Sequence, residues 1–207
     1  PAWYRLTLPA GDAVAERELV SALGALPHLL LTLPVEDLFG AEKGIYTHPM
    51  STGDEWERVA RIQYVAESGA VASEVTGGVR IQGGWNRRPE ESPKHSFRLA
   101  FRARLGAAKW KVALFGGKTE NFDQLILRAG NNHSWLHWSG AERRQADFLR
   151  DPWMRATHAA MGHSAARSRP VHLFLNGLYW GVYDLSERPD GKFASDAWGG
   201  KERDYDA

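Results

Sequence analysis

The chain has 207 residues, with 26 Lys and Arg against 25 Asp and Glu, no Cys, and 43% hydrophobic residues. The charge balance excludes a generically basic nucleic-acid-binding protein, so any anion-binding site must be local. The absence of Cys excludes disulfides and thiolate metal sites, and no apolar run is long enough for a membrane-spanning helix. The length is sufficient for one domain with a buried core.

The first half of the chain predicts one helix followed by several strands. Residues 12–23 fit an amphipathic helix with Asp12 as its N-cap, and residues 28–34 fit a buried strand that ends at Pro34. Strands are expected at 58–67 and 71–84, with a turn at Ser68-Gly69 between them. A polar loop at 86–93 leads into a strand that ends at residue 102, and shorter strands are expected at 110–116 and 123–130.

The stretch SPKHSFRLAFR (92–102) has the period-two pattern of a half-buried strand. Apolar residues and His95 occupy the odd positions, and the even positions carry three cations and no carboxylate: Lys94, Arg98 and Arg102. Arg102 is expected to face solvent or a carboxylate. Lys94 allows two interpretations, a surface lysine that maintains solubility or a strand lysine that contacts nucleotide phosphates, as in protein kinases.

The second half predicts a main helix and a hairpin. Residues 139–162 are helical in pattern, with Ser139 and Glu142 as a capping box and a restart of the helix at Asp151-Pro152. Asn176-Gly177 predicts a type I′ turn within a hairpin at 171–187, and the tail 188–207 is expected to be irregular. The fold class is therefore α+β, a mostly antiparallel sheet with one main helix before the last hairpin.

Two short motifs indicate chemistry only weakly. FGGKT (115–119) lacks the first glycine of a phosphate-binding loop, because Val112 occupies that position, so a tight turn is the better interpretation. His133 and His137 have the i, i+4 spacing of a zinc pair. The glutamate of H-E-x-x-H is absent, which favours loop histidines and ranks a histidine-based metal hydrolase last among the candidate functions.

Several segments occur together in a recognisable order. They are GVRIQGGWNRRPEESPKHSFRLAFR (78–102), LILRAGNN (125–132), FLRD (148–151), VHLFLNGLYWGVYDLSERPDGKF (171–193) and DYDA (204–207). On these segments the chain resembles the spore-coat protein H (CotH) kinase family. The resemblance implies a domain division into an N-terminal extension of unknown role at 1–30 and, at 31–207, the N-terminal part of an atypical protein-kinase-like domain.

The resemblance also implies chemistry for named residues. Members of the family are expected to use ATP and Mg²⁺ to phosphorylate a serine-containing protein substrate, at an extracellular location or on the cell or spore surface. Lys94 would contact the phosphates, and Arg80 with the loop 83–92 would lie over them. Asp151 would lie on the helix beside that lysine, and Glu187 near the adenine and ribose. His95 replaces a second basic residue of the family pattern and is expected to have no catalytic role.

The family's catalytic and metal-binding aspartates are expected beyond the DYD segment. This position implies that the chain is the ATP-binding part of a kinase, inactive without a C-terminal lobe, and that its exposed apolar face promotes self-association. The alternative is a non-catalytic binding or structural module of a secreted or surface protein. In that case the tryptophan-rich loops at 83–85 and 131–138 would hold a partner.

Overall fold

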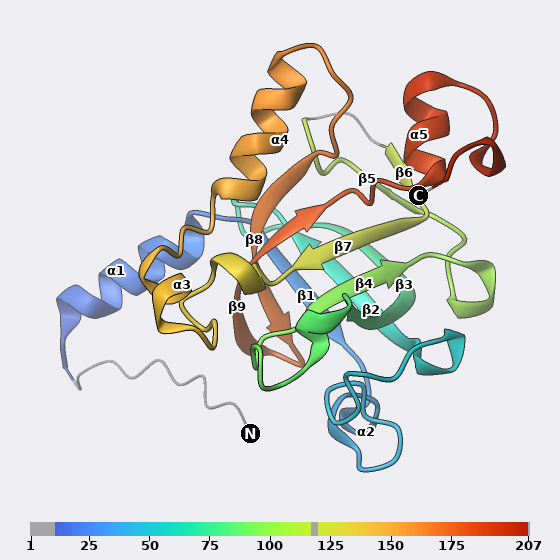
Figure 1. Ribbon diagram of the computed structural model, residues 1–207. Helices are drawn as coiled ribbons and strands as arrows, with labels where there is room; N and C mark the ends of the chain where they lie inside the picture. Colours follow the sequence, from blue (N-terminus) through green and yellow to red (C-terminus); the bar gives the residue numbers. More distant parts are fainter. Residues whose placement is uncertain (1–10, 117–119, 207) are drawn as a thin grey trace.

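The computed structural model describes residues 11–116 and 120–206. Its centre is a closed barrel with the strand order β1-β2-β3-β4-β7-β9-β8 (Figure 1). Neighbouring strands are antiparallel except β1 and β8, which pair in parallel. The barrel strands are β1 (His28–Thr32), β2 (Arg58–Val65), β3 (Val71–Gln82), β4 (Ser96–Ala100), β7 (Gln124–Arg128), β8 (Ser168–Leu175) and β9 (Leu178–Ser186).

The barrel interior is the hydrophobic core. Alternate residues of each strand point inward, as the pleat of a strand requires, and Phe97 and Leu99 of β4 are fully buried there. Burying a side chain of this size contributes about 1.5–3 kcal/mol. The predicted alternation holds over Ser96–Leu99, but β4 is shorter at both ends than the sequence indicated. Lys94 and His95 lie before β4 and are both buried, so the pattern does not extend over the whole 92–102 stretch.

Within the described residues, five α-helices and a small two-stranded sheet surround the barrel. They are α1 (Ala13–Gly24), α2 (Val35–Phe39), α3 (Gly140–Arg144), α4 (Arg150–Ala160) and α5 (Gly191–Trp198), with the hairpin of β5 (Trp110–Val112) and β6 (Glu120–Phe122). In the view of Figure 1, α4 and α5 lie at one end of the barrel and α2 at the other. The α+β class with a mostly antiparallel sheet is therefore confirmed.

Some of the predicted helix caps and turns are present, and one capping box is absent. Asp12 caps α1 by accepting from the amides of Val14 and Ala15, and Asn176 and Gly177 both have the positive φ that a type I′ turn requires. The expected capping box does not form, because the Ser139 side chain makes no capping hydrogen bond.

The helix expected at 139–162 is divided into α3 and α4. The second helix begins at Arg150, and Leu149 rather than Asp151 occupies its N-cap position. In the intervening segment the Phe148 ring packs so closely on Gly130 that a Cβ on that glycine would lie 3.0 Å from it. The tertiary contact made by Phe148 accounts for a break that helical periodicity alone does not show.

The irregular tail expected at 188–207 is wrong, because α5 occupies part of it. Asp190 caps this helix by accepting from the amide of Phe193 at 3.1 Å, and Gly199 ends it with a φ of 82°. The Asp and Gly residues that suggested irregular structure therefore mark the two ends of a helix. The FGGKT motif extends into 117–119, outside the described residues. Within the described ranges, no helix has both the length and the apolar character needed to cross a bilayer.

Candidate functional site

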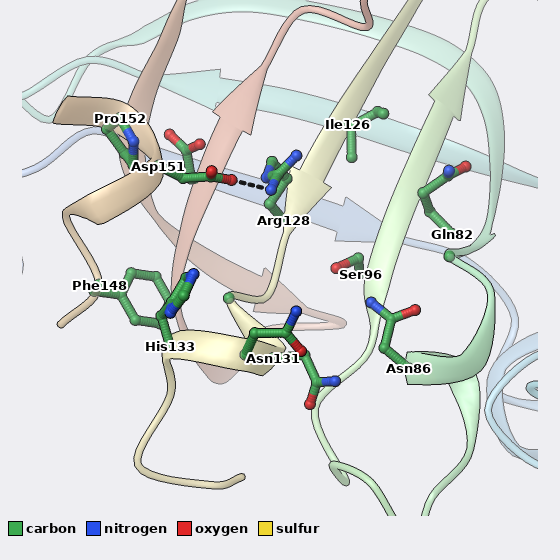
Figure 2. A pocket seen from close by; sticks show the side chains of 14 residues that line it. Gln82, Asn86, Ser96, Ile126, Arg128, Asn131, His133, Phe148, Asp151 and Pro152 are labelled. Carbon is green, nitrogen blue, oxygen red and sulfur yellow. Dashed lines mark hydrogen bonds and ion pairs between the residues drawn. The ribbon is translucent and has the colours of Figure 1, made fainter. Parts of the chain in front are cut away.

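The outer face of β3, β4, β7 and β9 forms the floor of a pocket. The strand register places Gln82 opposite Ser96, and Arg128 opposite Asp184. These four side chains line a cavity of about 310 Å³ (Figure 2). The alternation that sends Phe97 and Leu99 into the core thus sends polar groups outward to this cavity.

The walls of the pocket come from two loops and the start of α4. Gly130 is left-handed (φ 71°) and leads into a 3-10 turn at Asn131–His133, which closes one side. Asp151 reaches from α4 toward Arg128 of β7, with which it forms an ion pair (Figure 2). Asp151 therefore lines the pocket, and its partner there is Arg128 of β7.

Two residues that line this pocket each have one buried acceptor atom without a hydrogen-bond partner, namely Asn131 Oδ1 and Asp184 Oδ1. The other carboxylate oxygen of Asp184 accepts from Arg155 at 3.1 Å. Burial raises the pKa of Asp184 from its usual value, although Ser168 and Arg155 oppose the shift. Unpartnered buried acceptors are uncommon in folded proteins, and here two of them belong to residues of one pocket.

Lys94 is buried next to the pocket, with 7% of its surface exposed. Its ammonium group donates to the carbonyl of Val182 and lies 4.2 Å from the ring centroid of Tyr183 and 4.9 Å from that of Phe148. Among the described residues no carboxylate lies within 4 Å of it. Burial lowers the pKa of Lys94 to about 7.

The burial of Lys94 excludes one of the two interpretations of this residue, that of a surface lysine. A lysine that maintains solubility keeps its ammonium group in water, and Lys94 does not. Phe148 both contacts the ammonium group and lines the pocket, so the cation lies next to the pocket wall. The solubility interpretation is therefore wrong, and Lys94 is a desolvated cation at the edge of a polar pocket.

Further arginines crowd the same face of the sheet. Arg98 donates from Nε to Gln124 at 2.9 Å, and its pKa is lowered to about 10, mainly by burial and then by the charges of Arg188 and Arg80. Arg80 donates to the carbonyl of Gly53 at 3.3 Å and lines a neighbouring cavity of about 230 Å³. Arginines of the sheet therefore line both cavities, Arg128 the first and Arg80 the second.

The remaining predicted residues lie in other networks. Arg102 binds Glu57 at 3.0 Å, which confirms the expectation that it faces a carboxylate. Glu187 accepts from the backbone amide of Arg167 at 2.8 Å and also pairs with its guanidinium. Glu187 is absent from the residues that line the first pocket. Asp151 therefore lines the pocket and Lys94 lies beside it, whereas Glu187 pairs with Arg167 elsewhere.

The two histidines of the zinc hypothesis make other contacts. His133 lies 3.2 Å from Arg150 Nη1, and His137 Nδ1 accepts from the amide of Ser139. Within residues 11–116 and 120–206, no group of three or more His, Cys, Asp or Glu side chains is arranged to hold a metal ion.

Sequence reasoning assigned no role to three residues of the site: Asn131, Phe148 and Asp184. Asp184 carried one available signal, because it is an acidic residue on a strand whose neighbours are apolar. Phe148 carried none, since its role depends on where the chain leaves the helical path between α3 and α4.

Comparison with protein families gives one match. The family model described as CotH kinase protein matches residues 79–205, more than half of the chain, and spans the pocket-lining strands and α4. A search of curated proteins finds no match.

Proposed function

Because the chain belongs to the CotH kinase family, we propose that it is the ATP-binding part of an atypical protein serine kinase. Family membership supports a kinase-related function, with a protein substrate and general use of ATP and a metal ion. The finer assignments proposed are nucleotide binding by Lys94 and the adjacent pocket, and serine as the phosphoacceptor. The proposed location is extracellular or on the cell or spore surface.

The observation that carries the proposal is that Lys94 is buried without a carboxylate partner among the described residues. A buried ammonium group without a carboxylate partner is costly, and nearby negative charge removes that cost. A nucleotide phosphate at the pocket edge, reached by displacing the Phe148 ring, would supply this charge. Arg98 and Arg188 would attract the same polyanion, because their mutual repulsion is relieved when an anion binds.

The pocket fits part of a nucleotide and does not fit a magnesium ion. Asn86, Asn131 and Asn132 line the pocket, and carboxamide groups can exchange hydrogen bonds with the hydroxyl and amino groups of a nucleoside. Asp151 and Asp184 are the two carboxylates among the lining residues, and both are paired with arginines. No step is therefore assigned to a metal, and the role proposed for these residues is to bind and orient the nucleotide.

Calorimetric titration with ATP and Mg²⁺ tests this assignment. The parent chain should bind, and Lys94→Met should bind about tenfold more weakly or not at all, because one phosphate-binding cation is lost. Lys111→Ala is the matched control, since Lys111 is an exposed lysine on β5 and its loss should leave affinity unchanged. Equal affinity of the parent and Lys94→Met would contradict the role of the lysine.

A non-catalytic binding module is the second candidate, and exposed tryptophans favour it. Trp135, Trp138 and Trp153 are each more than 60% exposed, and such rings are common anchors of protein interfaces. This candidate predicts that partner binding depends on the tryptophans and that ATP does not bind. ATP binding that depends on Lys94 would contradict it.

A further inference from the structure

The second cavity, of about 230 Å³, lies on the other side of the turn that follows β3. Thr52, Gly53, Arg80, Ile81, Gln82, Gly83 and Arg87 line it. Gln82 and Gly83 also line the first pocket, so the two cavities share one wall. Asn86 lines the first pocket and the next residue, Arg87, lines the second, because the short 3-10 turn at Trp85–Arg87 directs successive side chains apart.

Arg87 is a buried cation whose hydrogen bonds are incomplete. Its residue surface is 7% exposed, its Nη2 donates to the carbonyl of Ser51, and its Nε has no partner. In the described part of the chain, no carboxylate lies within 4 Å of it. Burial, and then the charge of Arg80, lower the pKa of Arg87. A guanidinium in this position is fixed by the fold and lacks a counter-ion.

Arg80 adds a second positive charge to the same cavity. Its closest carboxylate is that of Asp54, at 3.8 Å, and Asp54 is exposed and held by Arg102 and Arg104. No carboxylate is among the residues that line the cavity. Two guanidinium groups beside the Thr52 hydroxyl and the backbone of two glycines match the requirements of a tetrahedral oxyanion.

We infer that this cavity is an oxyanion subsite for a phosphoserine of the protein substrate, separate from the nucleotide site; the inference rests on the proposed kinase function. Arg80 and Arg87 would then bind the substrate rather than the nucleotide phosphates, which the resemblance implied for Arg80 and the loop 83–92. The volume supports one charged group rather than a nucleotide, because whole small-molecule ligands usually occupy ~300–1,000 Å³. The shared wall at Gln82 and Gly83 places a phosphoserine beside the nucleotide pocket. The kinase would thereby favour a serine near one that is already phosphorylated.

Calorimetry with a phosphoserine peptide tests the subsite. The peptide should bind the parent chain, and Arg87→Met should weaken its binding about tenfold or more, because a charge-assisted pair is lost. Arg87→Lys should restore part of the affinity, and Arg80→Gln should weaken binding as well. Arg61→Gln, which changes an exposed arginine paired with Glu74, is the matched control and should have no effect. Thermal melting of each variant establishes that it is folded.

Three outcomes would overturn the subsite. The first is that inorganic phosphate or the unphosphorylated peptide binds as tightly as the phosphopeptide. The second is competition between ATP and the phosphopeptide, and the third is that Arg87→Met loses as much affinity for ATP as for the phosphopeptide. ATP binding without any phosphopeptide binding would overturn the subsite and leave the nucleotide proposal intact. Phosphopeptide binding without ATP binding would support the oxyanion site and contradict the nucleotide proposal.

Discussion

The ammonium group of Lys94 lies 4.2 Å from the ring centroid of Tyr183, a fully buried residue of β9. The Phe148 ring covers it from another element, and the Val182 carbonyl accepts its hydrogen bond. Aromatic faces attract a cation but do not replace its hydration completely, which explains why the pKa of Lys94 is lowered to about 7. Lys94 therefore changes charge near neutral pH.

The first prediction concerns the stability of Lys94→Met as a function of pH. The native pKa of Lys94 is about 7 and its ordinary value is 10.5, so between these values the unfolded chain binds more protons than the native chain. The stability of the parent should therefore rise with pH across this window. Lys94→Met should be more stable than the parent below pH 7, by about 5 kcal/mol at most, and this advantage should disappear towards pH 10.5.

Denaturant unfolding of both proteins at several pH values from 6 to 10 measures this difference. A difference in unfolding free energy that stays constant with pH would show that Lys94 does not titrate in the native state near neutrality.

The second prediction concerns His95, which packs against the Tyr46 ring with centroids 4.9 Å apart. Burial, and then the charge of Arg87, lower the pKa of His95 from 6.5 to about 4. The native chain therefore binds fewer protons than the unfolded chain between these values, and stability should fall as pH drops from 6.5 to 4. The loss should reach about 3 kcal/mol at most. The free energy of unfolding of His95→Phe should fall less than that of the parent between pH 6.5 and pH 4. An equal fall in both proteins would contradict the lowered pKa of His95.

The third prediction concerns Asn176 in the β8–β9 turn. Its carboxamide accepts from the amide of Leu33 at 3.0 Å and donates to the Leu33 carbonyl at 2.9 Å, while its own φ is 49°. Asn176→Ala loses both hydrogen bonds and leaves the left-handed backbone at this position without the polar side chain that makes the conformation accessible to Asn. The free energy of unfolding should fall by about 2–4 kcal/mol. Asn121→Ala, at an exposed position of β6, should change it little.

The fourth prediction concerns self-association. Trp153 and Met154 are exposed on α4, and Leu149 is exposed just before it. An apolar surface of this kind favours association at high concentration. Sedimentation velocity should show an average mass that rises with concentration, and Trp153→Ser with Met154→Ser should reduce this rise. A clean monomer of the parent chain at high concentration would contradict the prediction.

Local patterns in the sequence predict those features that depend on neighbouring residues. The alternation of Phe97 and Leu99 identifies β4, and Asn176-Gly177 identifies the hairpin, because pleat and turn geometry are local properties. Closure of the barrel depends on β1 pairing in parallel with β8, more than 130 residues later in the chain. No local signal reports such a pairing.

The candidate site likewise combines features that depend on neighbouring residues with contacts between distant segments. Lys94 was recognisable as a cation on a polar strand face, but its burial depends on Phe148, Val182 and Tyr183 from two distant segments. Arg167, the partner of Glu187, was equally unpredictable, because a charge pair across β8 and β9 depends on their register. The sequence therefore indicated which charged residues could act in the site, but not which residues they contact.

The central claim is that Lys94 meets the nucleotide phosphates, and proton uptake on binding tests it most directly. Lys94 with a pKa of about 7 is largely neutral at pH 8, and a bound phosphate would recharge it. Calorimetric titrations of ATP with Mg²⁺ at pH 8, in two buffers of different ionisation enthalpy, measure the protons taken up. The account predicts an uptake of about one proton per nucleotide for the parent chain and none for Lys94→Met. Equal uptake by both proteins would contradict it.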